Sequence, residues 1–408
     1  MRPLPSFEEL SAIGQRRRKV INLAAKFSIP VIGCKIALMQ TISQRTVRQN
    51  GVDIVAMPGS APDSVQADRK RVDSETMATP TEDEIFLQVP PLYADLAARM
   101  GEAGIRLRLL TERERARVIS RNEQRWPMLA NGRWKRLALR YGLRAVGLYA
   151  RGYRNFLNVQ VTHHDVALPQ LPPAFHGLRI LHLSDLHIDL DPALSPVVHE
   201  IITRQDYDML VITGDLRASV IGSTDETVAA LLPLLRAAKA PTYAVLGNHD
   251  FLAMVPPLEN AGVRFLLNET VPLTRDGQTI YLSGVDDAAL YATDDVPRAA
   301  AMLPPAAVAI LLSHTPDLYL TAVAHGYDLM LAGHTHAGQI CLPGGRIMQK
   351  NAYAPDFMLS GAWRYGSLHG YTTAGVGATG VPLRFGCLPE AVIHTLRRET
   401  FVSSKNRT

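Results

Sequence analysis

The chain has 408 residues, of which 47% are hydrophobic and 20% charged, so it can bury the core of one large domain and a smaller one. Its net charge of +5 is unevenly spread: residues 1–150 hold 25 lysines and arginines against 15 acidic residues, and residues 151–408 hold 18 against 23. The basic N-terminal part indicates an anionic partner. The cysteines, Cys34, Cys341 and Cys387, lack any CxxC spacing, which excludes a cysteine-rich zinc site and a disulfide framework.

Residues 1–90 show no convincing periodicity and are predicted to be a poorly ordered or linker-like extension. Their most apolar run, residues 20–39, contains Lys26, Lys35 and Pro30, so it does not read as a membrane-spanning helix. The basic residues 16–19 before it raise twin-arginine export as a minority alternative. We expect a cytoplasmic protein, with peripheral attachment to the inner membrane as a further option.

Residues 91–160 are predicted to form a basic helical region. Its first charged run, TERERARVIS at residues 111–120, is interpreted as a solvated helix face. Over residues 133–154 an apolar stripe recurs at helical steps, formed by Trp134, Leu137, Tyr141, Ala145 and Leu148, and it is flanked by Arg133, Arg136, Arg140, Arg144 and Arg151. This helix fits an anionic membrane surface, or its stripe packs on the rest of the protein. No recognised nucleic-acid motif accompanies it, so a nucleic-acid partner is not expected.

From residue 161 to residue 400 apolar strands alternate with turns and helices, before a short tail at residues 401–408. Two packed mixed sheets covered by helices on both sides fit this pattern. Five apolar runs end in short polar residues: LRILHLSD, DMLVITGD, PTYAVLGNHD, VAILLSHTP and YDLMLAGHTH. Because the carboxyl ends of strands in one sheet meet at one edge, we expect these polar residues to converge.

The convergent residues are suited to holding metal ions. They are Asp185, His187, Asp215, Asn248, His249, His314, His334 and His336. Carboxylates, imidazoles and an amide oxygen suit borderline divalent ions such as Mn, Fe or Zn. Asp215 has two oxygens and can bridge two ions, and such a pair activates a water and stabilises both oxygens of an in-line displacement at phosphorus.

With these motifs, residues 175–400 resemble the calcineurin-like metallophosphoesterase superfamily, most closely its bacterial membrane-associated branch of UDP-2,3-diacylglucosamine diphosphatase-like enzymes. The resemblance implies a four-layer αββα sandwich with two divalent metal ions and with His249 as the general acid. One ion would take Asp185, His187, Asp215 and His336, and the other would take Asp215, Asn248, His314 and His334.

The sequence departs from the family's pattern at two positions. Ala218 replaces the second aspartate of GDxxD, which in relatives helps to orient the catalytic histidine, and Ala337 replaces a frequent glycine. Either Asp250, which follows His249, takes over the orienting role, or His249 is held less firmly. Arg217 is interpreted either as a phosphate contact or as a structural ion pair.

The sequence thus predicts a metal-dependent hydrolase of phosphoric esters or anhydrides. The expected substrate is a phosphorylated compound, with a lipid-linked or nucleotide-sugar diphosphate as the leading candidate. A nuclease or a cyclic-nucleotide phosphodiesterase shares the chemistry and stays open. A non-catalytic binding protein is disfavoured, because a decayed site would usually have lost at least one ligand.

Overall fold

The computed structural model describes residues 89–125, 133–347 and 350–399. The chain divides into two compact units, residues 1–77 and 78–408, and all described residues belong to the second. The predictions for the linker-like extension, the apolar run at 20–39, the basic residues 16–19 and the tail at 401–408 therefore concern residues outside the described part, except for the last two residues of the extension.

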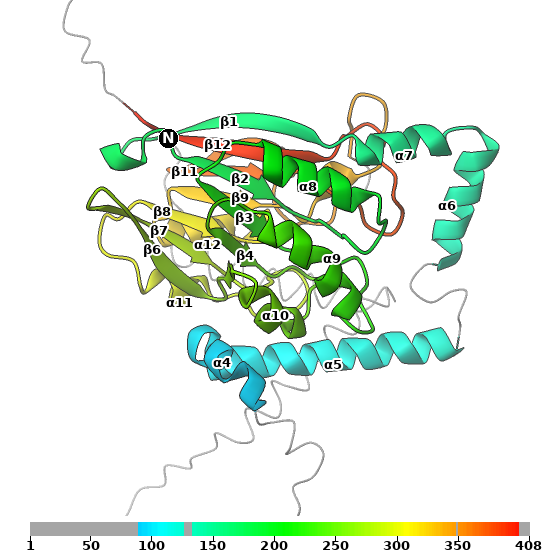
Figure 1. Ribbon diagram of the computed structural model, residues 1–408, viewed down its shortest axis with the longest axis horizontal. Coiled ribbons are helices and arrows are strands. Elements are labelled where there is room, and N and C mark those ends of the chain that lie inside the picture. The colour runs from blue at the N-terminus through cyan, green and yellow to red at the C-terminus, as the bar shows by residue number, and fades with distance from the viewer. Residues whose placement is uncertain (1–88, 126–132, 348–349, 400–408) are drawn as a thin grey trace, which may run out of the picture. The chain divides into compact units, whose positions relative to one another are not determined.

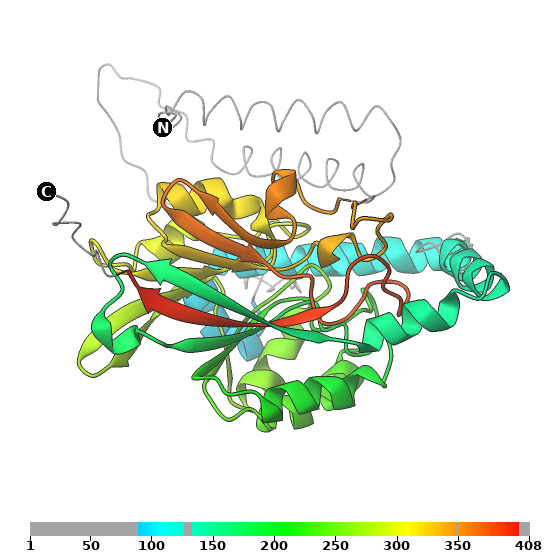
Figure 2. The ribbon, with the colours of Figure 1, turned by 90° about the horizontal axis from the view of Figure 1, so that it is seen from above.

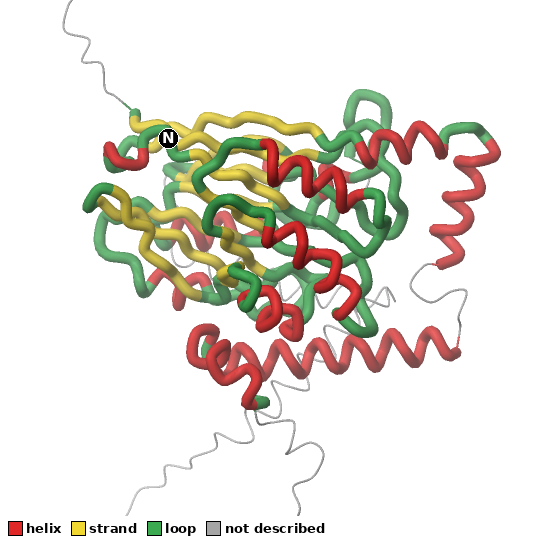
Figure 3. The backbone as a smooth tube through the Cα atoms, in the orientation of Figure 1, coloured by secondary structure: helices red, strands yellow, loops and turns green. Residues whose placement is uncertain are grey.

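Twelve strands form two six-stranded sheets in the described part of the chain (Figures 1 and 3). In spatial order, the first sheet comprises β1 (Gln160–Leu168), β12 (Glu390–Arg398), β2 (Arg179–Leu183), β3 (Met209–Thr213), β4 (Thr242–Val245) and β5 (Val263–Phe265). The second comprises β10 (Gly361–Tyr365), β11 (Leu368–Thr372), β9 (Leu329–Ala332), β8 (Ala309–Leu312), β7 (Gln278–Gly284) and β6 (Glu269–Arg275). Both sheets are mixed, because the pairs β12–β2, β6–β7 and β10–β11 are antiparallel and the others are parallel.

Three apolar clusters hold the layers together. The middle one lies between the sheets and joins residues such as Ile180 and Val211 to Leu282 and Ile310. A second packs the first sheet against α8 (Leu194–Arg204), α9 (Asp225–Arg236) and α10 (Val255–Glu259). The third packs the other sheet against α11 (Val296–Ala300) and α12 (Tyr319–Ala324). This arrangement confirms the predicted αββα sandwich, and Figure 2 shows it from above.

Short 3-10 segments lie in the connections. They are η1 (Pro91–Tyr93), η3 (Pro173–Phe175), η4 (Leu252–Met254), η5 (Pro316–Leu318), η6 (His336–Gly338) and η7 (Asp356–Met358). The strands β7 and β11 each have an antiparallel neighbour, and β8 and β9 lie between them.

Two helices before the sandwich are packed firmly against it. α4 (Ala94–Met100) and α5 (Glu102–Arg125) bury Leu96, Met100 and Ile105 in the cluster of the first sheet. Arg99 lies beside the edge strands β5 and β6 of the two sheets. It forms ion pairs with Glu259 at 3.0 Å and with Glu269 at 2.8 Å. These contacts join the helices to both sheets.

The predicted single helix over residues 133–154 is divided in two. α6 (Arg133–Ala145) ends before Gly147, which has a positive φ of 71°, and α7 (Tyr149–Leu157) begins beyond it. α7 is anchored by Phe156, which is fully buried. None of the helices in the described ranges combines the length with the apolar character that crossing a bilayer requires.

Candidate metal centre

All the predicted ligand segments lie just beyond the carboxyl ends of strands. Asp185, Asp215 and Asn248 follow β2, β3 and β4 of the first sheet, whereas His314 and His334 follow β8 and β9 of the second. Because the two sheets are packed face to face, their strand ends deliver the ligands to one place. The centre therefore depends on both sheets keeping their relative position.

The structure brings the predicted side chains into overlapping clusters. Ligand atoms lie within 4.8 Å of one another in three groups, which are Asp185–His187–His336, His187–Asp215–His249 and Asp215–His314–His334. Oδ2 of Asp215 is central: it lies 3.6 Å from Nε2 of His187 and 3.4 Å from Nε2 of His314. Asp215 is thus shared by two of the three clusters.

Several contacts within these clusters are consistent with bound cations. Nε2 of His187 lies 3.2 Å from Nε2 of His336, and Nδ1 of His334 lies 3.1 Å from Nε2 of His314. Oδ1 of Asp185 is buried without a hydrogen-bond partner among the described residues. An unpaired buried carboxylate oxygen beside facing ring nitrogens is unfavourable unless a positive charge lies between them. The donor set therefore suits divalent ions.

Backbone carbonyls fix which ring nitrogen faces the centre. Nδ1 of His187 bonds to the carbonyl of Arg217 at 2.8 Å, and Nδ1 of His314 bonds to that of Thr213 at 2.7 Å. Because a carbonyl only accepts, these Nδ1 atoms carry the proton and leave Nε2 free for a metal. His334 is reversed, since its Nε2 bonds to the carbonyl of Asn351 at 3.1 Å and its Nδ1 faces the cluster.

The charges around Asp215 are strongly coupled. Burial opposes the carboxylate's charge, but His314, His249 and His187 hold the pKa of Asp215 well below its usual value. Burial likewise opposes protonation of His314, yet Asp215 raises the pKa of His314 to about 10. A metal bound here would have to displace that proton. Burial lowers the pKa of His334 and His336, so they are neutral and ready to ligate.

His249 lies at the edge of the cluster in a different setting. Its Nδ1 donates to the carbonyl of Ala218 at 2.8 Å, its backbone N–H donates to Oδ1 of Asp215 at 2.8 Å, and its Nε2 lies 3.9 Å from Oδ2 of Asp215. The ring is only partly buried. Asn248, the neighbouring residue, places Oδ1 3.1 Å from Nε2 of His314. The two neighbouring side chains therefore face different groups: Asn248 faces His314, and the His249 ring is held by Ala218.

Asp250 does not perform the orienting task suggested by the sequence. Its Oδ1 accepts from the backbone N–H of Leu216 at 2.8 Å and of Arg217 at 3.3 Å, and its Oδ2 accepts from that of Gly247 at 2.8 Å. It therefore ties the loop after β4 to the loop after β3. The His249 ring is held instead by the carbonyl of Ala218, at the position where relatives carry the second aspartate.

The backbone at the centre is strained. Asp185, His187, Asp215, His334 and His336 all have positive φ values, between 41° and 71°. Such conformations cost energy in residues other than glycine and cluster at functional sites. Close approach also requires glycine: a Cβ on Gly247 would lie 2.3 Å from Oδ1 of Asp215, and one on Gly333 would lie 2.0 Å from Oγ of Ser184.

Three arginines near the metal centre were not identified from the sequence. Arg108 and Arg115 on α5 donate to backbone carbonyls of residues 247–250, so the charged run at 111–120, interpreted as a solvated face, in part faces this loop. Arg108, Glu112 and Arg115 stand at i, i+4 and i+7, and this spacing, which places them on one helix face, was the sequence feature that indicated a shared contact surface. Arg384 is fully buried and donates to the carbonyl of His336 at 2.8 Å, and no motif marked it.

Three further polar residues contact the protein interior and not the metal clusters. His182 is buried in the core and bonds to Oγ1 of Thr213 at 2.8 Å. Arg217 is also buried; its Nη2 donates to the carbonyl of Ile221 at 3.0 Å, and its guanidinium lies 4.8 Å from the ring centre of Phe251. Sγ of Cys341 contacts the carbonyl of Ala337 at 3.1 Å and is separate from the metal clusters.

Comparison with known proteins agrees with this geometry. Residues 178–338 match the calcineurin-like phosphoesterase family. The uncharacterized metallophosphoesterase YkuE of Bacillus subtilis (strain 168) is 31% identical over 260 residues, which cover 60% of this chain and 89% of that protein. The chain belongs to this family. It is therefore a metal-dependent phosphoester hydrolase, as predicted.

Two further relatives are described as a phosphodiesterase and as a transmembrane protein. The phosphodiesterase YaeI of Escherichia coli (strain K12) is 30% identical over 227 residues, covering 53% of this chain and 80% of that protein. A transmembrane protein with a metallophosphoesterase domain from Bos taurus is 31% identical over 315 residues, covering 67% and 68%. The helices α4 to α7 lie before the residues that match the family.

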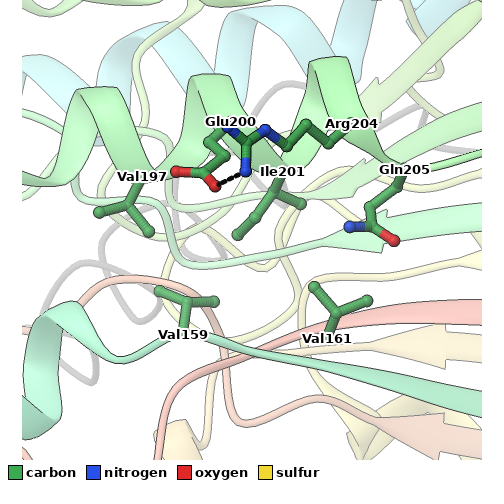
Figure 4. Close-up of a pocket in the computed structure, with 7 residues that line it drawn as sticks. All are labelled: Val159, Val161, Val197, Glu200, Ile201, Arg204 and Gln205. Carbon is green, nitrogen blue, oxygen red and sulfur yellow. Dashed lines mark ion pairs between the residues drawn. The ribbon is translucent and has the colours of Figure 1, made fainter.

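A pocket elsewhere on the sandwich is separate from the metal centre. It lies between β1 and α8 and is lined by Val159, Val161, Val197, Glu200, Ile201, Arg204 and Gln205 (Figure 4). An ion pair between Glu200 and Arg204, at 2.6 Å, crosses its rim. None of these residues belongs to the metal-ligand clusters, so this pocket is not part of the candidate metal centre.

Proposed function

We propose that this metallophosphoesterase hydrolyses a phosphoric ester or diphosphate bond of a lipid-linked or nucleotide-sugar substrate at an anionic membrane surface. The observation that carries the proposal is a basic arm, α6 and α7, on a chain that also holds the candidate metal-ligand clusters. Residues 133–157 contain seven lysines and arginines and no acidic residue. The bacterial membrane-associated branch that the motifs resemble is consistent with this reading.

The arm leaves apolar side chains in solvent. Trp134 is 45% exposed, Tyr141 is 62% exposed and Leu148 is 42% exposed, so these members of the stripe are open to solvent. Arg144 lies over the ring of Tyr149 at 4.7 Å. Figure 1 shows α6 at the right margin, away from the strands. Exposed aromatic residues among basic ones fit a helix that lies in the headgroup region of an anionic bilayer.

The residues of the centre have separate roles in this proposal. Asp185, His187, Asp215 and His336 would hold one ion, and Asp215, Asn248, His314 and His334 would hold the other, with Mn, Fe or Zn as candidates. Two bound ions would activate a water and neutralise charge on the phosphoryl oxygens.

His249 supplies the proton. Its Nδ1 is held by Ala218, so Nε2 is the atom that exchanges protons. As the water oxygen bonds to phosphorus and the bond to the leaving oxygen breaks, Nε2 transfers its proton to that leaving oxygen. Asp250 contributes by holding the loops that carry Asp215 and His249.

The test compares how a substrate is presented. Purified protein with Mn would be given a lipid-linked diphosphate in phosphatidylcholine vesicles with and without phosphatidylglycerol, and a soluble nucleotide-sugar diphosphate. Phosphorus NMR would follow the products. We expect cleavage of the diphosphate bond, faster on anionic vesicles. Cleavage of cyclic nucleotides or nucleic acid without cleavage of either diphosphate would overturn the proposal in favour of the alternative phosphodiesterase function.

A further inference from the structure

One face of α5 is directed at the loop that carries Asn248 and His249. Arg108, Glu112 and Arg115 stand at i, i+4 and i+7 and therefore share that face. Nη2 of Arg108 donates to the carbonyl of Asp250 at 2.8 Å, Oε1 of Glu112 accepts from the N–H of Leu252 at 3.0 Å, and Nη1 of Arg115 donates to the carbonyl of Asn248. The three side chains engage the loop along its length.

The same face also engages the loop after β7, which belongs to the other sheet. Arg108 forms a fully buried ion pair with Asp286 at 3.1 Å, and its guanidinium stacks on the ring of Tyr291 at 3.5 Å. Nη1 of Arg115 lies 3.2 Å from the hydroxyl of Tyr291. Burial raises the pKa of Tyr291 to about 12, so this hydroxyl stays neutral. α5 therefore links a loop of one sheet to a loop of the other.

This link matters because the metal ligands come from both sheets. Asn248 comes from the first sheet and approaches His314 of the second at 3.1 Å. The carbonyl of Asn248 belongs to the peptide unit that precedes His249, so a donor fixed on that oxygen limits rotation of the backbone at both residues. Figure 1 shows α5 running beside the sandwich, and it precedes the segment matched by the family.

We propose that Arg115 is a positioning residue for this enzyme: it fixes the Asn248–His249 peptide, so that α5 is part of the catalytic apparatus and not only a packed extension. The inference rests on the proposed role of His249. Arg108 and Arg115 both contact Tyr291, so Arg108 helps to hold Arg115 in place through this ring. Because Arg108 is wholly buried, its replacement would disturb folding, and Arg115, which is partly exposed, is the better probe.

The experiment is a double-mutant cycle. Arg115→Leu is made in the wild type and in a His249→Ala background, and kcat is measured with aryl phosphoesters of graded leaving-group acidity. Misplacement of a catalytic group costs about tenfold to a hundredfold, so we expect such a fall in wild type for the least acidic leaving group. The fall should shrink as the leaving group becomes more acidic, and in the His249→Ala background it should be less than about twofold.

Arg117→Leu is the matched control, since Arg117 lies on the same helix and pairs only with Glu114 in the described contacts. Arg115→Lys should recover most of the lost rate, and KM and metal content should stay unchanged. If Arg115→Leu is poorly folded, Tyr291→Phe removes the shared hydroxyl and should show a smaller fall with the same leaving-group pattern.

The outcomes separate the two proposals. Equal losses from Arg115→Leu in both backgrounds, or behaviour like that of Arg117→Leu, would overturn the positioning role while His249 keeps its own. If His249→Ala leaves kcat unchanged, the assignment of His249 fails, and the role of Arg115 fails with it. A loss of bound metal in Arg115→Leu would make the helix a support of Asn248 as ligand and contradict an effect through His249.

Discussion

The αββα sandwich and the α6–α7 arm differ in how their polar groups are used. At the metal centre, carboxylates and imidazoles are buried or partly buried and bonded to one another or to backbone carbonyls, and the backbone adopts strained conformations to bring them together. In the arm, basic residues have no acidic neighbours in sequence and apolar residues face solvent. The comparison teaches that the metal-ligand clusters and the proposed attachment surface lie in separate parts of the chain, so loss of either one should leave the other intact.

Loss of Asp215 should have the largest effect. Asp215→Ala removes the central carboxylate from both ion sites, and stabilisation worth several kcal/mol corresponds to a fall in kcat of about 10³-fold or more. Bound metal, measured by elemental analysis, should fall for both ions, whereas binding to anionic vesicles should not change. Asp206→Ala, which removes an exposed carboxylate, is the control. Two tightly held ions in Asp215→Ala would refute the bridging role.

Loss of His249 should affect chemistry without affecting metal. Because the proposed ligand is Asn248 and not His249, His249→Ala should retain both ions and lower kcat by roughly 10²–10⁴. The loss should be smaller for acidic leaving groups, which need little protonation. His199→Ala, an exposed histidine on α8, is the control. If metal is lost together with activity and the loss is the same for all leaving groups, His249 is a ligand, as its place in one of the clusters also allows.

Neutralising the arm should separate attachment from hydrolysis. Lys135, Arg140 and Arg144 are exposed, and each basic residue near an anionic surface contributes about 1 kcal/mol, so replacing all three with glutamine should weaken vesicle binding roughly a hundredfold. Hydrolysis of a small soluble ester should stay within about twofold. The control replaces Arg275, Arg364 and Arg397 of the sandwich, which are equally exposed. Equal sedimentation of both triple variants would rule out the arm as the attachment surface.

The sequence predicted the fold and the convergence of the candidate ligands because both depend on local patterns. An apolar run followed at once by Asp, Asn or His marks a strand end, and five such runs determine where the ligands meet. Strain at Asp185 or His334 could not be foreseen, since positive φ in a residue other than glycine is imposed by its surroundings.

The role of α5 was missed for a related reason. A charged run on a helix looks the same whether it faces water or a loop, and what separates the two is a distant partner. Asp286 and Tyr291 lie more than 170 residues after Arg108 in the chain. The exposure of Trp134 and Tyr141 was equally undetermined, because the stripe pattern suits a packed helix and an exposed one.

Restoring the family's aspartate should have the smallest effect. In relatives a carboxylate helps to orient the histidine, but here the carbonyl of Ala218 already accepts from Nδ1 of His249 at 2.8 Å. The Asp189 carboxylate also lies close by, since it accepts from the backbone N–H of Ala218 and, at 3.1 Å, from that of Ser219. A second carboxylate at position 218 would be repelled by Asp189 and would have no free proton on Nδ1 to accept. Ala218→Asp should therefore change kcat by less than about threefold, well below the effect of removing a catalytic proton donor. Steady-state rates over a range of pH provide the measurement. A gain of tenfold or more would show that the carbonyl is a poor substitute for the carboxylate, and that His249 of the natural chain is held less firmly than its geometry indicates.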